Sequence, residues 1–232
     1  VVFTDAGSDV FAYWNVPGAW PRFVIPVVGD CGINLPVRLA LGGAAPFSGT
    51  ATLMRDDLRA AGLIPLTEPY SAQGYAYVGS SPGASVAPAL LAVTGANAVV
   101  DWVVVELRNA TAPSVVVESR AALIQRDGEL MDVNGEAWLN FASPPGNYHV
   151  AVRHRNHLAV RTATAVACGP STFGVDFTRA GVAYGTLPTK DNTYLGQTLW
   201  SGDATSNGDL KYTGSGNDRD PIILAVGGTT PN

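Results

Sequence analysis

Apolar and polar residues alternate along the central part of the chain as they do in β-strands. Residues 99–108 place Val103 and Val105 on one face and Glu106 on the other. The run 148–155 has the same period of two. Further runs rich in β-branched residues follow at intervals of about ten positions, separated by turn sequences such as Asp-Gly and Pro-Gly. The pattern predicts a succession of strands and no helix of normal length in this region.

We expect about seven or eight strands, which is enough for two antiparallel sheets packed face to face. The predicted fold is therefore all-β, an Ig-like antiparallel β-sandwich over residues 30–180. Residues 52–62 are an exception, because they combine helix formers with a Thr near the start and a Gly at the end, and they predict a short helix or turn. Residues 64–90, rich in Pro, Gly, Ser and Tyr, predict an ordered surface excursion, where function often lies.

The two ends differ from the middle. Residues 1–29 carry many aromatic rings, including Trp14 and Trp20, and we expect them to pack on the sandwich or on a partner. Residues 181–232 are interpreted as a linker followed by a short ion-binding segment. With the sandwich at residues 30–180, the chain is predicted to have three parts.

Composition narrows the class of partner. The 232 residues are 47% hydrophobic and 14% charged, with a formal net charge of −5, and only two of the basic residues are lysines. This charge does not suit a surface that follows a phosphate backbone, so we expect no nucleic acid partner. No apolar run approaches the roughly 20 residues that span a bilayer, so we expect no membrane-spanning segment.

The strongest local signal for chemistry lies near the C-terminal end. A calcium loop takes side-chain oxygens at its first, third and fifth positions and Gly at the sixth, and the sequence places Asp203, Thr205, Asn207 and Gly208 there. Oxygen donors without His or thiol select Ca²⁺ over zinc. The third position is usually Asn or Asp, and the closing carboxylate of Asp218 comes four residues late, so a polar turn cluster is the alternative. The expected calcium ligands are Asp203, Thr205, Asn207, Asp209 and Asp218.

Signals for catalysis are weak. The sequence has no nucleophile elbow, zinc-protease, phosphate-loop or dinucleotide motif, and we predict that it is not an enzyme. His149 and His154 project to opposite faces of a strand, which opposes a shared metal. We expect His149, Arg153 and Arg155 on a solvated face, and His154 or His157 held in a turn by hydrogen bonds.

Cys31 and Cys168 stand far apart, with no metal-ligand spacing around them. Two interpretations stay open at this point. They form a disulfide if the protein is exported, or else they are two small buried apolar groups.

Several stretches resemble a known class of protein. Residues 123–133 (LIQRDGELMDV), 145–158 (PGNYHVAVRHRNHL) and 202–222 (GDATSNGDLKYTGSGNDRDPI) resemble the C-terminal regions of large secreted surface proteins of Bacteroidota, and residues 62–70 are also similar. In that family these regions follow adhesin-like or enzymatic modules and precede a type IX secretion signal, and no catalytic activity is attached to them. The tail is similar to the calcium loop of dockerins. Since the chain begins with Val1 rather than Met, we interpret it as a piece of a longer precursor.

We therefore expect a non-enzymatic structural or adhesion module, extracellular or at the cell surface, stabilised by calcium. Its expected partners are copies of itself or other surface proteins, in a filament or matrix. The alternative is a carbohydrate-binding module of a secreted polysaccharide-degrading enzyme, which would bind an extracellular glycan through stacking rings. The aromatic residues expected at such a contact surface are Trp14, Trp20, Tyr70, Tyr75 and Tyr77.

Overall fold

The computed structural model gives a mainly β fold, as the sequence predicts. It describes residues 32–46, 52–79 and 81–228, together with the strands of residues 3–6, 9–12 and 24–26. The Ig-like sandwich type stays a prediction.

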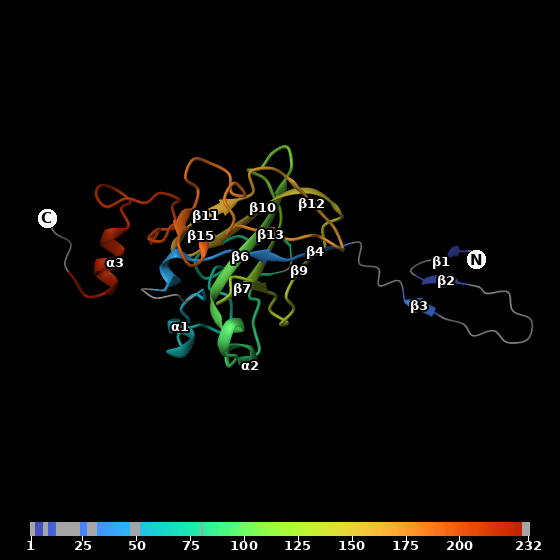
Figure 1. The fold of residues 1–232 in the computed structure, drawn as a ribbon, viewed down its shortest axis with the longest axis horizontal. Coiled ribbons are helices and arrows are strands. Elements are labelled where there is room, and N and C mark those ends of the chain that lie inside the picture. Colours follow the sequence, from blue (N-terminus) through green and yellow to red (C-terminus); the bar gives the residue numbers. More distant parts are fainter. Residues whose placement is uncertain are drawn as a thin grey trace, which may run out of the picture.

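The largest sheet has six antiparallel strands, seen across the centre of the body in Figure 1. The spatial order is β11-β10-β6-β7-β8, and β12 also pairs with β10. Their bounds are β6 Val99–Asn109, β7 Val116–Gln125, β8 Leu130–Met131, β10 Gly146–His154, β11 His157–Arg161 and β12 Val166–Cys168. The long strands β6, β7 and β10 are the ones with the clearest alternation in the sequence.

Shorter strands form small separate sheets. These are β1 Phe3–Ala6, β2 Asp9–Ala12 and β3 Val24–Pro26 in one sheet, and the pairs β4 Ile33–Leu35 with β9 Leu139–Phe141, β5 Val37–Arg38 with β13 Val175–Asp176, and β14 Lys190–Asn192 with β15 Gly196–Thr198. The β5–β13 pair is parallel and the others are antiparallel.

Helices are short. They are α1 Asp57–Ala60, α2 Pro88–Leu91 and α3 Arg219–Ala225, with 3₁₀ turns η1 Gly42–Ala44 and η2 Gly95–Asn97. The position of α1 confirms the short helix predicted within residues 52–62. Within the described ranges, no helix has the length and apolar character needed to cross a bilayer.

One face of the main sheet packs against the short strand pairs. Val103 and Val105 of β6 and Val152 of β10 share a core cluster with Ile33 and Leu35 of β4. The inward face predicted for β6 is therefore confirmed. Burial of these side chains is the main term that holds the two layers together.

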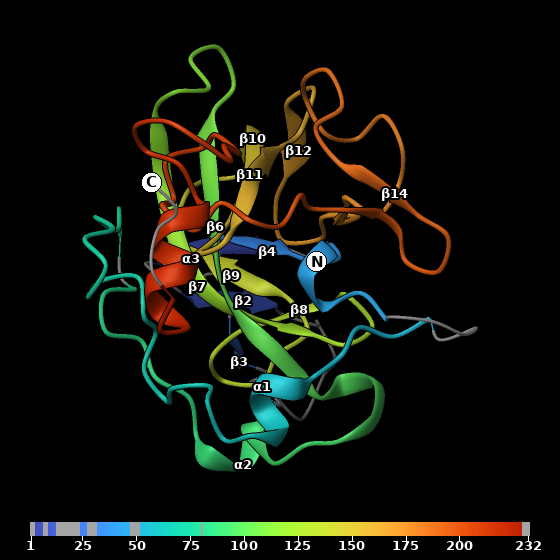
Figure 2. The same ribbon diagram turned by 90° about the vertical axis from the view of Figure 1, so that its left-hand side faces the viewer.

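The other face of the main sheet is covered by the excursion between α1 and α2. Ile64, Tyr70 and Val86 pack against Trp102 and Val104 in a second core cluster. Figure 2 shows this part of the chain, in teal and green, running along the outer side of the sheet towards α2. The excursion is thus ordered, as predicted, and the central strands are buried on both faces.

Residues after 180, predicted as a linker, pack on the body as far as residue 201. Leu199 is buried and its N–H donates to the carbonyl of Ala40 at 2.8 Å. Ala163 N donates to the carbonyl of Val182, also at 2.8 Å. Beyond this point lies α3, none of whose residues is buried, at one end of the body in Figure 1.

Candidate functional site

A cavity of about 780 Å³ lies where the β10–β11 turn meets the excursion and the C-terminal segment. Tyr75 lines it from the excursion, and Arg155 and Asn156 line it from the turn. Gly202 N donates to the carbonyl of Asn156 at 2.9 Å, and Ser206 Oγ donates to the carbonyl of Arg155 at 2.8 Å. The predicted calcium segment therefore rests directly on the β10–β11 turn.

Three buried side chains form a hydrogen-bonded chain beside this cavity. Asp101 Oδ2 lies 3.3 Å from His154 Nε2, and His154 Nδ1 lies 2.9 Å from His157 Nδ1. Gly43 N–H donates to His157 Nε2 at 3.0 Å, so the proton of neutral His157 is on Nδ1. That proton points at His154 Nδ1 and at Asn156 Oδ1, 2.7 Å away. His154 then carries its proton on Nε2 and donates it to Asp101.

The surroundings of Asp101 and His157 determine whether each side chain is charged. Burial alone raises the pKa of Asp101, but the hydrogen bond and charge of His154, with Arg155 Nη2 at 2.7 Å from the carboxylate, lower it overall. Burial, with the positive charge that His154 gains when it is protonated, lowers the pKa of His157 to about 3. His157 is thus neutral over the physiological pH range and Asp101 is ionised.

The arrangement is suited to holding the turn. Each of the four ring nitrogens of His154 and His157 already faces a partner within the chain. A metal on His157 Nδ1 would require a proton on Nε2, where Gly43 N–H is the donor. Across the described ranges, no three His, Cys, Asp or Glu side chains are grouped to hold a metal ion.

The prediction of a solvated His149 is wrong. This side chain is buried, and its Nδ1–H donates to the carbonyl of Thr162 at 3.0 Å. The chain that follows β11 covers it, which local alternation does not reveal. Arg153 is exposed as expected, and its Nε donates to the buried Glu106 carboxylate at 2.7 Å. The hydrogen-bonded turn expected for His154 or His157 holds for both.

Asp203 organises the first half of the predicted calcium loop. Its carboxylate is buried and accepts the N–H of Asn207 at 3.0 Å on Oδ1 and that of Gly208 at 3.1 Å on Oδ2. Gly208 has a φ of +83°, which confirms the sharp turn predicted at the sixth loop position.

Asp218 organises the second half of the loop. Its Oδ1 accepts Thr205 N at 3.1 Å and Thr205 Oγ1 at 3.0 Å, and its Oδ2 accepts Lys211 N at 2.9 Å. The N–H of Lys211, followed by the N–H and the hydroxyl of Thr205, lowers the pKa of the Asp218 carboxyl. Asp209 is exposed and pairs with Lys211 Nζ at 3.2 Å. The loop therefore brings Thr205 against Asp218 and Asn207 against Asp203, and it leaves Asp209 outside. Calcium binding stays a prediction.

The tyrosines proposed for a stacking surface attach the excursion to the sheet. Tyr70 is buried and its hydroxyl donates to the carbonyl of Trp102 at 2.7 Å. Tyr75 Oη donates to Glu106 Oε1 at 2.8 Å, and the Tyr75 and Tyr77 rings meet edge to face. Tyr70 thus has no open ring face for a sugar, and the hydroxyls of the others are directed into the protein.

Glu68 links distant parts of the same excursion by accepting several hydrogen bonds. Its buried carboxylate accepts N–H groups from Tyr70 at 2.7 Å, Ser71 at 3.1 Å and Gly83 at 3.0 Å, and the Tyr77 hydroxyl at 3.1 Å. Burial raises the pKa of Glu68, but hydrogen bonds from the Ser71 hydroxyl, the Gly83 and Ser71 N–H groups and the Tyr77 hydroxyl outweigh it, so the pKa is lowered. The carboxylate is a local structural centre.

Some predicted residues lie outside the described part of the chain. Trp14, Trp20 and Cys31 are among them, so their roles stay predictions. Cys168 is buried, its Sγ is 3.6 Å from the carbonyl of Val166, and burial raises the pKa of its thiol to about 11. Burial suits either of the two interpretations made for this cysteine.

Sequence reasoning missed Asp101, which is the acceptor of the histidine chain. The available signal was a single carboxylate inside an otherwise apolar run on β6, because a buried charge needs a partner.

Comparisons with protein-family models, curated proteins and solved structures found no match. The function is accordingly argued from the chemistry of the molecule itself.

Proposed function

We propose that the chain is a non-enzymatic structural or adhesive module of an extracellular surface protein, with a sandwich-type β body and a C-terminal segment stabilised by calcium. The observation that carries this proposal is how the buried carboxylates are used. Glu118 accepts the N–H groups of Ala142 and Ser143, Glu106 binds Arg153, and Asp101 binds His154. These bonds all join segments of the same chain.

A catalytic acid or base needs an atom that can reach a substrate. His154 and His157 border the 780 Å³ cavity, but their ring nitrogens are committed to internal partners. The two buried histidines most suited by type to proton transfer therefore support a structural role, and this favours a module without catalysis.

The sandwich is supported by the second layer. The β4–β9 and β5–β13 pairs contribute Leu35, Phe141 and Val175 to the core cluster that faces the main sheet. Short strands stacked on a long antiparallel sheet meet the basic packing requirement of two β layers.

Calcium would act on the segment from Asp203 to Asp218. The ion would be held by these two carboxylates with oxygens of Thr205 and Asn207, and it would supply the positive charge that joins the two halves of the loop. The donor set fits, since all of these are oxygen ligands and Gly208 makes the required turn. The loop is held to the body mainly through the β10–β11 turn. Coordination of a calcium ion would therefore stabilise a segment that makes few contacts with the body.

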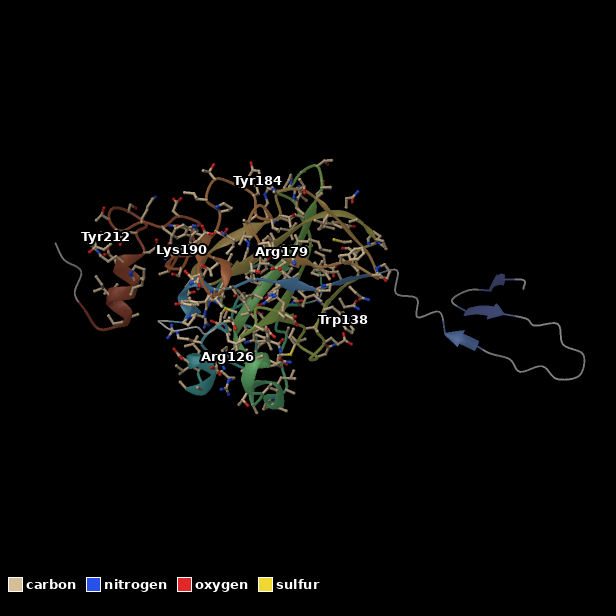
Figure 3. All side chains as sticks on the ribbon, viewed as in Figure 1. Arg126, Trp138, Arg179, Tyr184, Lys190 and Tyr212 are labelled. Atoms are coloured by element: carbon tan, nitrogen blue, oxygen red, sulfur yellow. The ribbon has the colours of Figure 1, made fainter. Side chains whose placement is uncertain are left out.

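The adhesive role is supported by apolar side chains exposed around α3. Tyr212, which Figure 3 shows beside this helix, is largely exposed, and the apolar residues of the helix add to the same end of the molecule. Exposed apolar patches of this kind mark contact surfaces. The exposed apolar residues are Leu210, Tyr212, Ile222, Leu224 and Val226.

Size-exclusion chromatography with light scattering tests the assembly half of this proposal on the full chain. We expect a larger particle mass in millimolar calcium than in EDTA, because the ordered loop fixes the α3 surface. The double variant Asp203→Asn, Asp218→Asn should lose the difference, and the exposed Asp57→Asn should keep it. Equal masses of wild type in calcium and EDTA would contradict calcium-linked assembly.

Glycan binding is the second candidate, and one specific observation favours it. Phe173 stands fully exposed beside a groove of about 670 Å³. This is a different place from the tyrosines first considered.

A further inference from the structure

Phe173 projects into the solvent from a loop that is hydrogen-bonded to the body on both sides. Its relative exposure is 106%. The loop that carries it is fixed on both sides, since Asn34 N donates to the carbonyl of Gly169 at 3.0 Å and Val175 N donates to that of Pro36 at 2.9 Å. Gly174 has a φ of +84°, and a Cβ there would lie 3.0 Å from the Pro36 oxygen.

An exposed ring on such a loop is unusual. A flexible loop could fold its Phe onto nearby apolar surface, and burial of an aromatic ring is strongly favourable. The close approach of Gly174 to Pro36 leaves the loop little freedom to do so. The ring is therefore available to an external partner.

Phe173 borders the groove, which lies between β5, β13 and the chain after β11. Its volume of about 670 Å³ is within the range of sites for small ligands. Among its charged lining residues, Arg38 and Arg179 are balanced by Glu129 and Asp176. Equal numbers of positive and negative groups give no preference for an anionic or a cationic ligand.

The polar groups of the groove remain accessible. Arg179 is exposed, and Figure 3 shows it on the body; only its Nε is joined to Asp176, at 3.1 Å. The guanidinium keeps further N–H donors in a planar fork. Glu129 is exposed and offers a carboxylate acceptor. Together they present donors and acceptors to a ligand that carries both kinds of group.

We infer that this groove binds an uncharged oligosaccharide, whose sugar ring stacks on Phe173 while adjacent hydroxyls bond to Arg179 and Glu129. Sugars combine an apolar C–H face with hydroxyls that donate and accept, which is the chemistry the groove offers. The inference deepens the second candidate function, glycan binding, by naming the class of glycan and the residues that hold it, and it rests on that candidate.

Isothermal titration calorimetry of the full chain tests this inference with uncharged hexasaccharides of β-linked glucose, xylose, mannose and N-acetylglucosamine. At least one should bind, and hexagalacturonate, the anionic probe, should not bind more tightly. Phe173→Ala should weaken the affinity at least tenfold, because it removes the stacking ring. Arg179→Ala should weaken it as well. Tyr212→Ala is the matched control, since it removes an exposed ring away from the groove, and it should bind as wild type does.

The inference is overturned if none of the uncharged hexasaccharides binds, if Phe173→Ala binds as tightly as wild type, or if hexagalacturonate is preferred. Self-association of wild type that Phe173→Ala abolishes, without sugar binding, would assign the ring to a protein contact and also overturn it. Since the exposed ring is not part of the core, the variant should melt as wild type does. Calcium-dependent mass is measured separately, so loss of sugar binding alone leaves the structural proposal standing.

Discussion

Single side chains decide how the β10–β11 turn is attached to the rest of the molecule. His157 accepts Gly43 N–H, and this one bond sets the proton positions of His154 and the role of Asp101 as final acceptor. A buried charge left without its partner is costly, so each link depends on the next. The hydrogen bonds of Asp101, His154 and His157 thus join β6, the β10–β11 turn and η1.

The stability of the protein should fall as the pH is lowered from 6.5 towards 3. Unfolded His157 takes up a proton in this window, whereas folded His157, whose pKa is lowered to about 3, does not, so acid favours the unfolded state. The full difference is on the order of 5 kcal/mol. His157→Gln keeps an acceptor for Gly43 N–H but cannot titrate. Urea unfolding at a series of pH values should show a shallower decline for the variant.

Asp101 contributes to the pH dependence of stability at lower pH than His157 does. Its pKa is lowered by folding, so its stabilisation is present above the unfolded pKa and is lost only as the pH falls through the folded one. Above about pH 4.5, the difference in slope between wild type and His157→Gln therefore reports on His157. Parallel slopes for the two proteins would contradict the assignment of a buried neutral His157.

At the scale of elements, alternation located the long strands but not what covers them. The apolar run at the start of β6 is the sequence signal of a strand buried on both faces, and Trp102 lies under the excursion while Val103 faces the short strands. The pairs β5–β13 and β14–β15 have two or three residues per strand. Strands this short carry no measurable period, so their packing on the body could not be predicted.

The attachment of β14–β15 to the body is tested by a pair of glycines. A Cβ on Gly196, where φ is +74°, would lie 2.5 Å from the carbonyl oxygen of Thr178, which accepts the N–H of Gln197. Gly181 has a similar φ of +80° with nothing within 4 Å. Both Ala variants bear the conformational strain, but Gly196→Ala should lose at least about 1–2 kcal/mol more, because its neighbour must move.

Urea unfolding of the two variants measures this difference. Gly181→Ala serves as the control for backbone strain alone. If both variants lose the same stability, the hairpin is not packed on Thr178 as described, and residues after 180 form a linker after all.

At the scale of the whole molecule, the sequence predicts the mainly β fold better than it predicts which side chains are exposed. The turn at Gly208 follows from residue spacing, but which ring faces solvent does not, because aromatic content says nothing about orientation. Tyr70 was expected at a contact surface and is buried, whereas Phe173, which belongs to no predicted site, is fully exposed. A single ring in a loop gives no pattern to recognise.

The whole molecule also separates into a firmly packed body and a lightly attached end. The body has two apolar clusters on the two faces of the main sheet. Residues 203–228, the described part of this segment, contribute no side chain to either cluster, and they are held by hydrogen bonds within the loop and to the β10–β11 turn. Its stability should therefore depend on the groups that close the loop.

Hydrogen–deuterium exchange of the full chain in millimolar calcium and in EDTA tests the central claim most directly. Backbone amides of residues 203–218 should exchange more slowly in calcium, while those of β6 should exchange equally in both, because the body does not depend on the ion. The double variant Asp203→Asn, Asp218→Asn should lose the protection. Identical exchange of residues 203–218 with and without calcium would contradict a calcium-stabilised module.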